Sequence, residues 1–372
     1  MDRSELSAWL RLLETPGLGL EAARRLLAAA GSPQAALELP APAQRELLTP
    51  KQRQALSELP PLWPDLLDKT WAWLEDNPAH SLLTLGDPDY PAALLATADP
   101  PLLLYLAGRR ELLACPGLAI VGSRSPTPQG RDNAEQFARA LSQAGLTIIS
   151  GLALGIDAAA HRGGLGGAAS SIGVLGTGLD QIYPSRHREL AAEMLQQGLL
   201  ISEYSLGTPA LPPNFPRRNR IIAGLSQGCL VVEAALRSGS LITARLASEA
   251  GREVFAIPGS IHSPLSKGCH ALIRQGAKLV ETAQDVLEEL PPLATTTAAC
   301  SHLPTSGDAG ALPAGAPAKV LAEMGFDPVS LDSLMARGGW PAHELSAYLL
   351  DLELDGHVER LPGQLFQRRA KA

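Results

Sequence analysis

The first 80 residues carry apolar positions at helical spacing. The stretch from Leu6 to about Asp76 is rich in Leu and Ala and predicts a set of helices. A turn, Thr15-Pro16-Gly17-Leu18-Gly19, separates two amphipathic segments, the second of which runs from Glu21 to Ala30. This order is typical of a helix-hairpin-helix (SAM-like) unit, whose backbone N–H groups can bind phosphate. We favour a protein-contact bundle for residues 1–80, because Glu21 stands where a phosphate-binding hairpin would carry Lys or Arg.

Over residues 81–290 the pattern changes to short apolar runs that alternate with helical stretches and glycine turns. Helices are predicted from about Gln129 to Ala144 and from near Gly155. Strands that alternate with helices imply βαβ crossovers and a parallel sheet covered on both faces. We therefore predict an α/β, Rossmann-like domain whose ligand lies at the carboxyl ends of the strands. The predicted strands are 118–121, 146–149, 172–175, 200–201, 229–232 and 254–257.

The C-terminal part of the chain indicates a linker and a third, small domain. Residues 291–318 are mostly Pro, Ala, Gly, Thr and Ser, and they cannot bury enough apolar surface to fold alone. Helical periodicity returns over residues 319–372. Two helices, near 330–334 and 343–353, precede a predicted hairpin over 358–366. Helix, helix and hairpin is the order of a winged-helix domain.

The composition narrows the functions that this chain can have. Its 372 residues are 45% hydrophobic, enough for two or three domains with buried cores. A net charge of -7 argues against a protein coated with nucleic acid, although screening over about 10 Å leaves room for a local basic groove. No apolar run reaches the ~20 residues of a bilayer span, and the N-terminus lacks the apolar core of a signal peptide. We expect a cytoplasmic protein that does not contact the membrane.

One segment of this acidic chain concentrates basic and aromatic side chains. Arg217, Arg218 and Arg220 lie within four positions, next to Phe215. Arginine guanidinium groups match phosphate oxygens bidentately, and an aromatic face can stack a base. An apolar run follows at once, so the arginines should be anchored at the edge of the core. The segment is therefore a candidate site for single-stranded nucleic acid.

Glycine turns after the predicted strands offer further contacts. Gly122-Ser123-Arg124 lies where a Rossmann-like sheet presents its first phosphate loop, and Arg124 can reach a backbone phosphate there. The full Gly-x-Gly-x-x-Gly fingerprint is absent, so we expect no dinucleotide cofactor. Ser238-Gly239-Ser240 is equally an anion cradle or an ordinary helix cap. Gly176-Thr177-Gly178 is more typical of a tight turn.

Catalytic and metal-binding chemistry have little support in the sequence. Asp157 and His161 lie four positions apart on a predicted helix and share a face. A metal site needs a third ligand, and we favour a structural pair over an acid–base pair. The four cysteines form no Cys-x-x-Cys pair, and the chain has no Walker loop, nucleophile elbow or zinc-protease motif. We therefore expect no catalytic residues, no cofactor and no metal.

Several long motifs occur in an order that is familiar from one protein family. They are Asp87-Pro88-Asp89-Tyr90-Pro91, Val121-Gly122-Ser123-Arg124, Ser150-Gly151-x-Ala153-x-Gly155-Ile156-Asp157-x-x-Ala160-His161, Asn214-Phe215-Pro216-x-Arg218-Asn219-Arg220-Ile221-Ile222-Ala223-Gly224-Leu225-Ser226, and Ser238-Gly239-Ser240-x-x-Thr243-Ala244. With these motifs, nearly the whole chain resembles the DprA (Smf) family of bacterial DNA-processing proteins of natural transformation.

The resemblance implies a Rossmann-like core that binds single-stranded DNA and forms a homodimer. It also implies a partnership with the RecA recombinase, which the family loads onto incoming single strands. Pro212-Pro213 replaces a basic residue that many members carry, which removes one expected phosphate contact. The region from Lys319 to Gln367 resembles the winged-helix domain of some members. The family's DNA contacts fall here on Ser123, Arg124, Phe215, Arg217, Arg218, Asn219 and Arg220, with Lys267 as a further candidate.

Two other functions would use parts of the same sequence. A nucleotide-hydrolysing enzyme of the lysine-decarboxylase-like group would share the Rossmann-like core, but the Pro-Gly-Gly-x-Gly-Thr-x-x-Glu motif of that group is missing and Glu233 is the only acid nearby. A winged-helix DNA-binding regulator would depend on the C-terminal residues alone. A preference for duplex over single-stranded DNA would favour the regulator.

Overall fold

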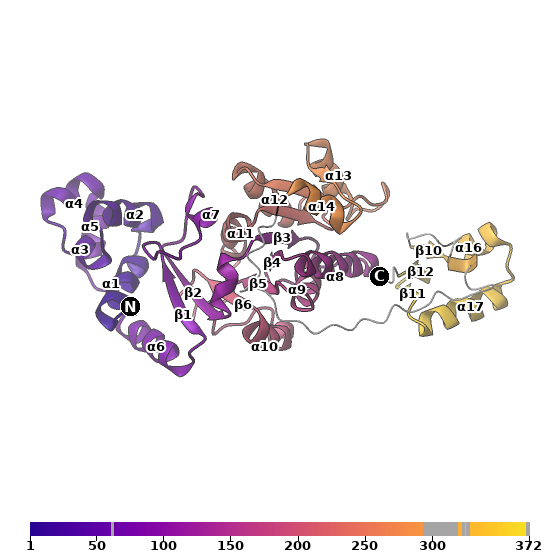
Figure 1. Ribbon diagram of the computed structural model, residues 1–372, viewed down its shortest axis with the longest axis horizontal. Coiled ribbons are helices and arrows are strands. Elements are labelled where there is room, and N and C mark those ends of the chain that lie inside the picture. Colours follow the sequence, from indigo (N-terminus) through magenta and orange to yellow (C-terminus); the bar gives the residue numbers. More distant parts are fainter. Residues whose placement is uncertain (61–62, 293–318, 322–323, 325–327, 370–372) are drawn as a thin grey trace.

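Three parts follow one another along the chain in the computed structural model. It describes residues 1–60, 63–292, 319–321, 324 and 328–369. A helical N-terminal part lies at one end, a large sheet with its covering helices occupies the centre, and a small α/β part lies at the other end (Figure 1). The expected linker, residues 291–318, falls outside the described residues except for its first two positions.

The N-terminal part is helical, as its periodicity predicts. Leu6, Leu10 and Leu26 are fully buried where α1, α2 and their neighbours meet. The hairpin turn between α1 and α2 packs against the protein: the Gln52 side chain donates to the carbonyl of Leu18 at 3.0 Å. This contact agrees with a protein-contact bundle. The helices are α1 (Arg3–Glu14), α2 (Gly19–Ala30), α3 (Pro33–Leu37), α4 (Ala41–Leu47), α5 (Pro50–Ser57) and α6 (Trp63–Asp76).

The central sheet contains every strand that the sequence predicted between residues 118 and 257, each within a residue or two of its expected place. The strand order is β1-β2-β6-β5-β4-β3-β7-β8-β9. From β6 to β9 all neighbours are parallel, but β1 and β2 pair antiparallel and β2 adds to β6 antiparallel. The sheet is therefore mixed. Its strands are β1 (His80–Thr84), β2 (Leu103–Gly108), β3 (Gly117–Val121), β4 (Thr147–Ser150), β5 (Ser171–Val174), β6 (Leu199–Ser202), β7 (Gly228–Val231), β8 (Glu253–Ala256) and β9 (Lys278–Leu279).

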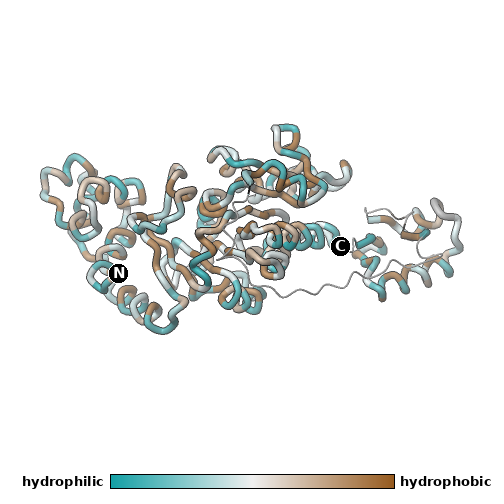
Figure 2. The backbone as a smooth tube through the Cα atoms, in the orientation of Figure 1, coloured by the Kyte–Doolittle hydropathy of each residue, from teal (hydrophilic) through white to brown (hydrophobic). Residues whose placement is uncertain are grey.

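Helices cover both faces of this sheet (Figure 1). Along β3, Leu118 and Ile120 pack on the side of α8 and α9, while Ala119 and Val121 pack on the side of α11 and α12. This alternation follows from the two-residue period of a strand, and Figure 2 shows the apolar strands between helices with polar outer faces. The helices are α7 (Ala92–Leu95), η1 (Arg110–Ala114), α8 (Pro128–Gln143), α9 (Ile156–Leu165), η2 (Ser185–His187), α10 (Arg188–Gln197), α11 (Asn214–Leu225), α12 (Ser240–Glu249), α13 (Lys267–Arg274) and α14 (Ala283–Glu289).

The C-terminal part has the helix, helix and hairpin order expected of a winged helix. Its strands form a small sheet in the order β10-β12-β11. Arg369, just after β12, pairs with Asp132 of α8 at 3.3 Å, so this part touches the central one. The fold class predicted from the sequence is confirmed. The elements are β10 (Val329–Ser330), α16 (Leu331–Gly338), α17 (Ala342–Leu354), β11 (Val358–Leu361) and β12 (Leu365–Arg368).

Candidate nucleic-acid interface

The candidate site lies where the strand order of the sheet reverses. After β3 the chain moves to β4 on one side, whereas β7 lies against β3 on the other. Loops that leave the carboxyl ends of such strands diverge and leave a crevice, the usual ligand position in this architecture. A cleft of about 450 Å³ opens here, lined by the loops after β3, β4 and β7 and by the first turns of α11 and α12.

Arg124 and Phe215 meet in this cleft. Arg124 extends from the loop after β3, and Phe215 lies in the first turn of α11. The Arg124 guanidinium carbon is 5.8 Å from the centroid of the Phe215 ring, within reach of a cation–π interaction. Arg124 is exposed, and no hydrogen bond or ion pair of its guanidinium group occurs among the described residues. A cation and an aromatic face are thus presented side by side.

The end of β5 makes room for the Phe215 ring. A side chain at Gly176 would place its Cβ 3.0 Å from Phe215 Cδ1, so glycine lets the ring lie close to the backbone without a tight contact. The ring also contacts Tyr183, with the centroids 5.5 Å apart. The glycine turn that looked like an ordinary tight turn in the sequence is therefore part of the site.

The loop that carries Arg124 is attached to the end of β7 by Glu233. Its carboxylate accepts hydrogen bonds from the backbone N–H of Thr127 at 2.9 Å and from the Thr127 hydroxyl at 2.6 Å. Thr127 also caps α8 by accepting from the N–H of Gly130. Burial raises the pKa of Glu233 above its usual value although these bonds oppose the rise. The carboxylate that an enzymatic function would have used is thus engaged in holding a loop.

Asp157 and His161 hold the turn that follows β4. The Asp157 carboxylate accepts from the N–H of Gly151 at 3.1 Å, and His161 Nε2 accepts from the N–H of Leu152 at 3.2 Å. Leu152 has a positive φ of 56°, a conformation that such bonds must stabilise in a residue other than glycine. The other ring nitrogen of His161 bonds Ser171 Oγ at 2.7 Å. This is the structural role that the sequence favoured for the pair.

Arg218 is buried rather than free to bind phosphate. Its side chain points into the protein and only 4% of the residue is exposed. The guanidinium group donates to the carbonyl of Gly151 at 2.6 Å and to the carbonyl of Val174. Burial lowers the pKa of Arg218 to about 10, so the group stays charged at neutral pH. Arg218 therefore ties α11 to the ends of β4 and β5.

Arg220 is likewise engaged inside the protein. It pairs with Glu203 and, at 3.0 Å, with Asp99. The exposed fractions of the Arg220 and Glu203 side chains are only 13% and 6%. Asp99 also pairs with Arg24 of α2 at 2.7 Å. The expectation that the three neighbouring arginines act alike is therefore corrected: two of the three charges already have partners within the fold.

The remaining predicted residues fall into two groups. Ser123 and Asn219 line the cleft, but both are mostly buried, and Asn219 accepts from Arg218 and donates to the carbonyl of Gly239. Arg217 and Lys267 are exposed and do not line the cleft. The Lys267 ammonium group donates to the carbonyl of Ile261. The structure thus places Ser123, Arg124, Phe215, Arg218 and Asn219 at one site and leaves Arg217 and Lys267 outside its walls.

Arg237 is a cleft residue that the sequence analysis missed. It lies in the loop between β7 and α12, is exposed, and lines the cleft together with Arg124. In the part of the chain that the structure describes, its guanidinium group makes no hydrogen bond or ion pair. The arginine stands one position before Ser238-Gly239-Ser240, so the neighbouring glycine turn was the available signal.

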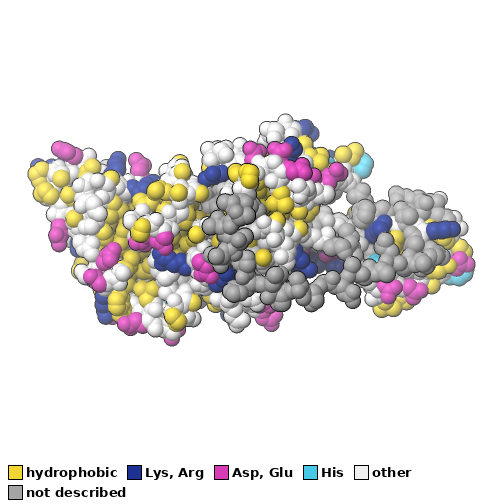
Figure 3. Space-filling model, viewed as in Figure 1, with side chains coloured by type: hydrophobic (Ala, Val, Ile, Leu, Met, Phe, Trp, Pro, Cys, Tyr) yellow, Lys and Arg dark blue, Asp and Glu magenta, His cyan; other side chains and the backbone are white. Residues whose placement is uncertain are grey.

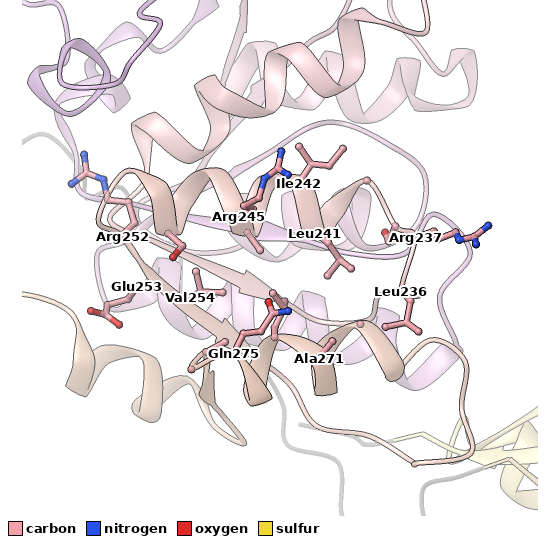
Figure 4. Close-up of a pocket in the computed structure, with 18 residues that line it drawn as sticks. Leu236, Arg237, Leu241, Ile242, Arg245, Arg252, Glu253, Val254, Ala271 and Gln275 are labelled. Carbon is pink, nitrogen blue, oxygen red and sulfur yellow. The ribbon is translucent and has the colours of Figure 1, made fainter.

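A second cavity, of about 690 Å³, lies between α12, β8 and α13. Figure 4 shows Leu241 and Ala271 facing this groove, whereas the Arg237 guanidinium group points away from it. Arg245 in the groove is paired with Glu249 at 3.5 Å, and no aromatic side chain lines it. Among the described residues, an exposed, unpaired arginine beside an aromatic ring therefore occurs in the cleft at the switch point and not in this groove.

The distribution of charge agrees with a confined site. On the face that Figure 3 shows, basic and acidic side chains alternate over the described surface instead of forming one broad basic area. Among the residues with described positions, no cluster of His, Cys, Asp or Glu could hold a metal ion. Over the same ranges, no helix combines the length and apolarity needed to span a membrane.

Fold and site together define a Rossmann-like protein with an exposed arginine and an aromatic ring in its switch-point cleft. The family model described as DNA recombination-mediator protein A matches residues 81–291, and the DprA winged helix domain matches residues 304–364. Protein Smf of Escherichia coli K12 is 45% identical over 302 residues, which cover 80% of this chain and 79% of that protein. The chain belongs to the DprA family.

Solved structures agree with this assignment. DNA processing protein A (DprA) from Streptococcus pneumoniae matches with a TM-score of 0.63 and 37% identity over 78% of this chain and 99% of that chain. DNA processing protein A from Helicobacter pylori, described by its single-stranded DNA binding mode, matches with a TM-score of 0.51 and 32% identity over 56% and 94% of the two chains.

Proposed function

We propose that this protein binds single-stranded DNA in the cleft that Arg124 and Phe215 line. The observation that carries the proposal is the exposed Arg124 guanidinium group against a half-buried aromatic ring at the strand ends. A single strand offers both groups that such a pair binds, a phosphate and an unpaired base. The single-stranded DNA binding mode described for the Helicobacter pylori relative supports the same ligand class.

Different residues of the site have different roles in this proposal. The exposed cations Arg124, Arg217 and Arg237 bind phosphates, and Phe215 stacks on a base. Of the buried residues, Arg218 positions α11. The first turn of α12 adds the positive end of its helix dipole to the cleft. Two further residues, Ser123 and Asn219, form part of the cleft wall. Arg220 holds α11 through its pairs with Asp99 and Glu203. Lys267 contacts DNA only if the strand continues beyond the cleft.

Binding of a fluorescent dT oligonucleotide to wild-type and variant proteins tests the proposal. Phe215→Ala should weaken binding by about 5- to 150-fold, as expected for one lost base stack of roughly 1–3 kcal/mol. Arg124→Ala should weaken binding and flatten the salt dependence by about 0.7 in the slope of log K against log salt for each lost phosphate contact. Arg245→Ala is the matched control: this arginine lines the groove between α12 and α13 but not the cleft, and the variant should bind like wild type.

Unchanged affinity in both cleft variants would remove the site assignment. A preference of the wild-type protein for duplex DNA would instead favour a function based on the winged helix. Release of free base from nucleoside monophosphates would favour an enzyme, although the Glu233 carboxylate is bonded to Thr127.

We propose further that the protein acts as a cytoplasmic homodimer that protects incoming single strands and loads RecA onto them during natural transformation. Membership in a family described as a recombination mediator supports this role. Two equal clefts in a dimer would raise affinity for long strands by avidity. Sedimentation of the purified protein tests the dimer. Assembly of RecA on DNA coated with single-strand-binding protein, with and without this protein, tests the loading.

A further inference from the structure

A second, smaller hollow also borders Arg124 and Phe215. Its volume is about 50 Å³, and it shares Arg124, Ala153, Phe215 and Arg218 with the main cleft. The arginine and the aromatic ring therefore form a ridge between two hollows. The remaining walls of the second hollow are Gly151, Leu154, Tyr183 and Pro184.

The outer wall of this hollow consists of exposed apolar side chains. Tyr183 is 50% exposed and Leu154 is 38% exposed. Only 4% of the residues in this chain are aromatic, so half of a tyrosine ring in solvent beside a DNA-binding ridge is a notable exception. Within the described ranges, the Tyr183 hydroxyl has no hydrogen-bond partner.

Tyr183 extends the aromatic surface of Phe215 instead of facing it across a gap. The two ring centroids are 5.5 Å apart and the planes are tilted by 43°. Rings at this separation are in contact, so a base cannot enter between them. A base can stack only on the outward faces, and the two rings offer one continuous surface.

The loop that carries Tyr183 is held in place on both sides. Before it, the Thr177 hydroxyl donates to the carbonyl of Gln181 at 2.6 Å. After it, His187 Nδ1 bonds the carbonyl of Leu152 at 2.9 Å. The ring is therefore positioned before any ligand arrives, which lowers the entropy lost on binding.

We propose that Tyr183, with Leu154 beside it, forms a second base subsite for single-stranded DNA. The strand crosses the ridge with a phosphate at Arg124, and successive unpaired bases lie on the Phe215 side and on the Tyr183 side. The hollow is too small to enclose a base, so it binds by stacking and discriminates little between bases. This inference rests on the proposed function and adds a nucleotide position to it.

Substitution of the ring tests the subsite. Tyr183→Ala should weaken binding of a dT oligonucleotide by about 5- to 10-fold, at the low end of the range for a base stack because the ring is half exposed. Tyr183→Phe keeps the ring and should bind within about twofold of wild type, since the hydroxyl makes no bond. Leu195→Ala, an exposed apolar residue of α10 outside both hollows, is the matched control and should leave binding unchanged.

A scan with abasic sites locates the base that Tyr183 stacks. In wild type, two positions along a short oligonucleotide should each lose affinity when their base is removed. In Tyr183→Ala one of these losses should disappear, and in Phe215→Ala the other, because each ring and its base then contribute nothing further. Loss of both effects in Tyr183→Ala would mean that this ring only supports Phe215, and it would overturn the subsite.

The two proposals fail in different ways. No binding of single strands by the wild-type protein would remove the proposed function itself. Binding that depends on Phe215 but is equal in wild type and Tyr183→Ala would leave that function in place and overturn only the second subsite.

Discussion

At the scale of single residues, burial separates arginines that the sequence presents as equals. Arg217, Arg218 and Arg220 lie within four positions, yet one is exposed, one bonds backbone carbonyls and one pairs with acids. A helix turns by about 100° per residue, so neighbours in α11 face different surroundings. The sequence shows the charged cluster, but it does not show which of its members are buried and which are exposed.

Arg218 and Arg124 should respond to truncation in opposite ways. Arg218→Ala leaves the carbonyls of Gly151 and Val174 without their donor and opens a cavity, which should lower the free energy of unfolding by about 3 kcal/mol or more. Arg124→Ala should change stability by less than about 0.5 kcal/mol while it weakens DNA binding. Urea unfolding and oligonucleotide binding of both variants provide the measurement. Wild-type stability of Arg218→Ala combined with weak binding would make Arg218 a direct DNA contact.

His161 should make the stability of the protein depend on pH. Burial, followed by the nearby Arg218 charge, lowers the pKa of His161 to about 3. The unfolded chain takes up the proton near pH 6.5 and the folded one does not, so this contribution is fully present above about 6.5 and is lost as the pH falls toward 3. Between pH 7.5 and pH 5 the loss should be about 2 kcal/mol.

Comparison with His161→Gln isolates this contribution. The substituted protein cannot take up the proton, so its unfolding free energy should fall less steeply with decreasing pH and approach the wild-type value near pH 5. Urea unfolding at several pH values measures both curves. Parallel curves would contradict the assignment of the pH dependence to His161.

At the scale of elements, loops fixed to distant strands create the site. The loop after β3 is attached to the end of β7 through Thr127 and Glu233, and the turn after β4 is attached to α9 through Asp157 and His161. These attachments place Arg124 and Ala153 at the cleft without help from a ligand. The periodicity of the chain predicted the strands and helices but none of these links, because each joins a side chain to a residue on another element or loop.

Removal of the α8 cap should weaken DNA binding indirectly. Thr127→Ala deletes the cap and one bond to Glu233, and it should cost about 1–2 kcal/mol of stability. The released loop should also lower the affinity for single strands, because it carries Arg124. Thr282→Ala, which removes the cap of α14, is the matched control: it should lose similar stability without a change in binding. Equal binding by both variants would show that the Thr127 cap does not influence DNA binding.

At the scale of the whole molecule, the candidate cleft lies entirely within the central part. Every residue that lines the cleft lies between Val121 and Leu265. The N-terminal helices are held to the central part by pairs such as Lys69 with Asp180 at 2.6 Å. The C-terminal part touches α8 through Arg369 and Asp132, whose side chains are 35% and 18% exposed. An ion pair near the surface contributes little, about 1 kcal/mol or less.

A protein cut after residue 292 should therefore keep its affinity for a dT oligonucleotide within about threefold, as expected when no phosphate or base contact is removed. The measurement is fluorescence anisotropy at two salt concentrations, and an equal salt slope should accompany the equal affinity. Full-length Arg369→Ala is the companion variant and should also bind normally. A loss of tenfold or more in the shortened protein would show that the winged helix takes part in binding.

The elements, their order and the family follow from the amino-acid sequence. Periodicities of two and 3.6 residues are local properties, so they predicted the parallel strands, the helices and the winged-helix part. Other features required the folded structure: β1 and β2 run antiparallel, Arg124 lies over Phe215, Arg218 is buried, and Arg237 and Tyr183 border the two hollows. These features depend on contacts between segments that are distant in the sequence. Exposure and pairing of a side chain are set by such contacts, which no local pattern records.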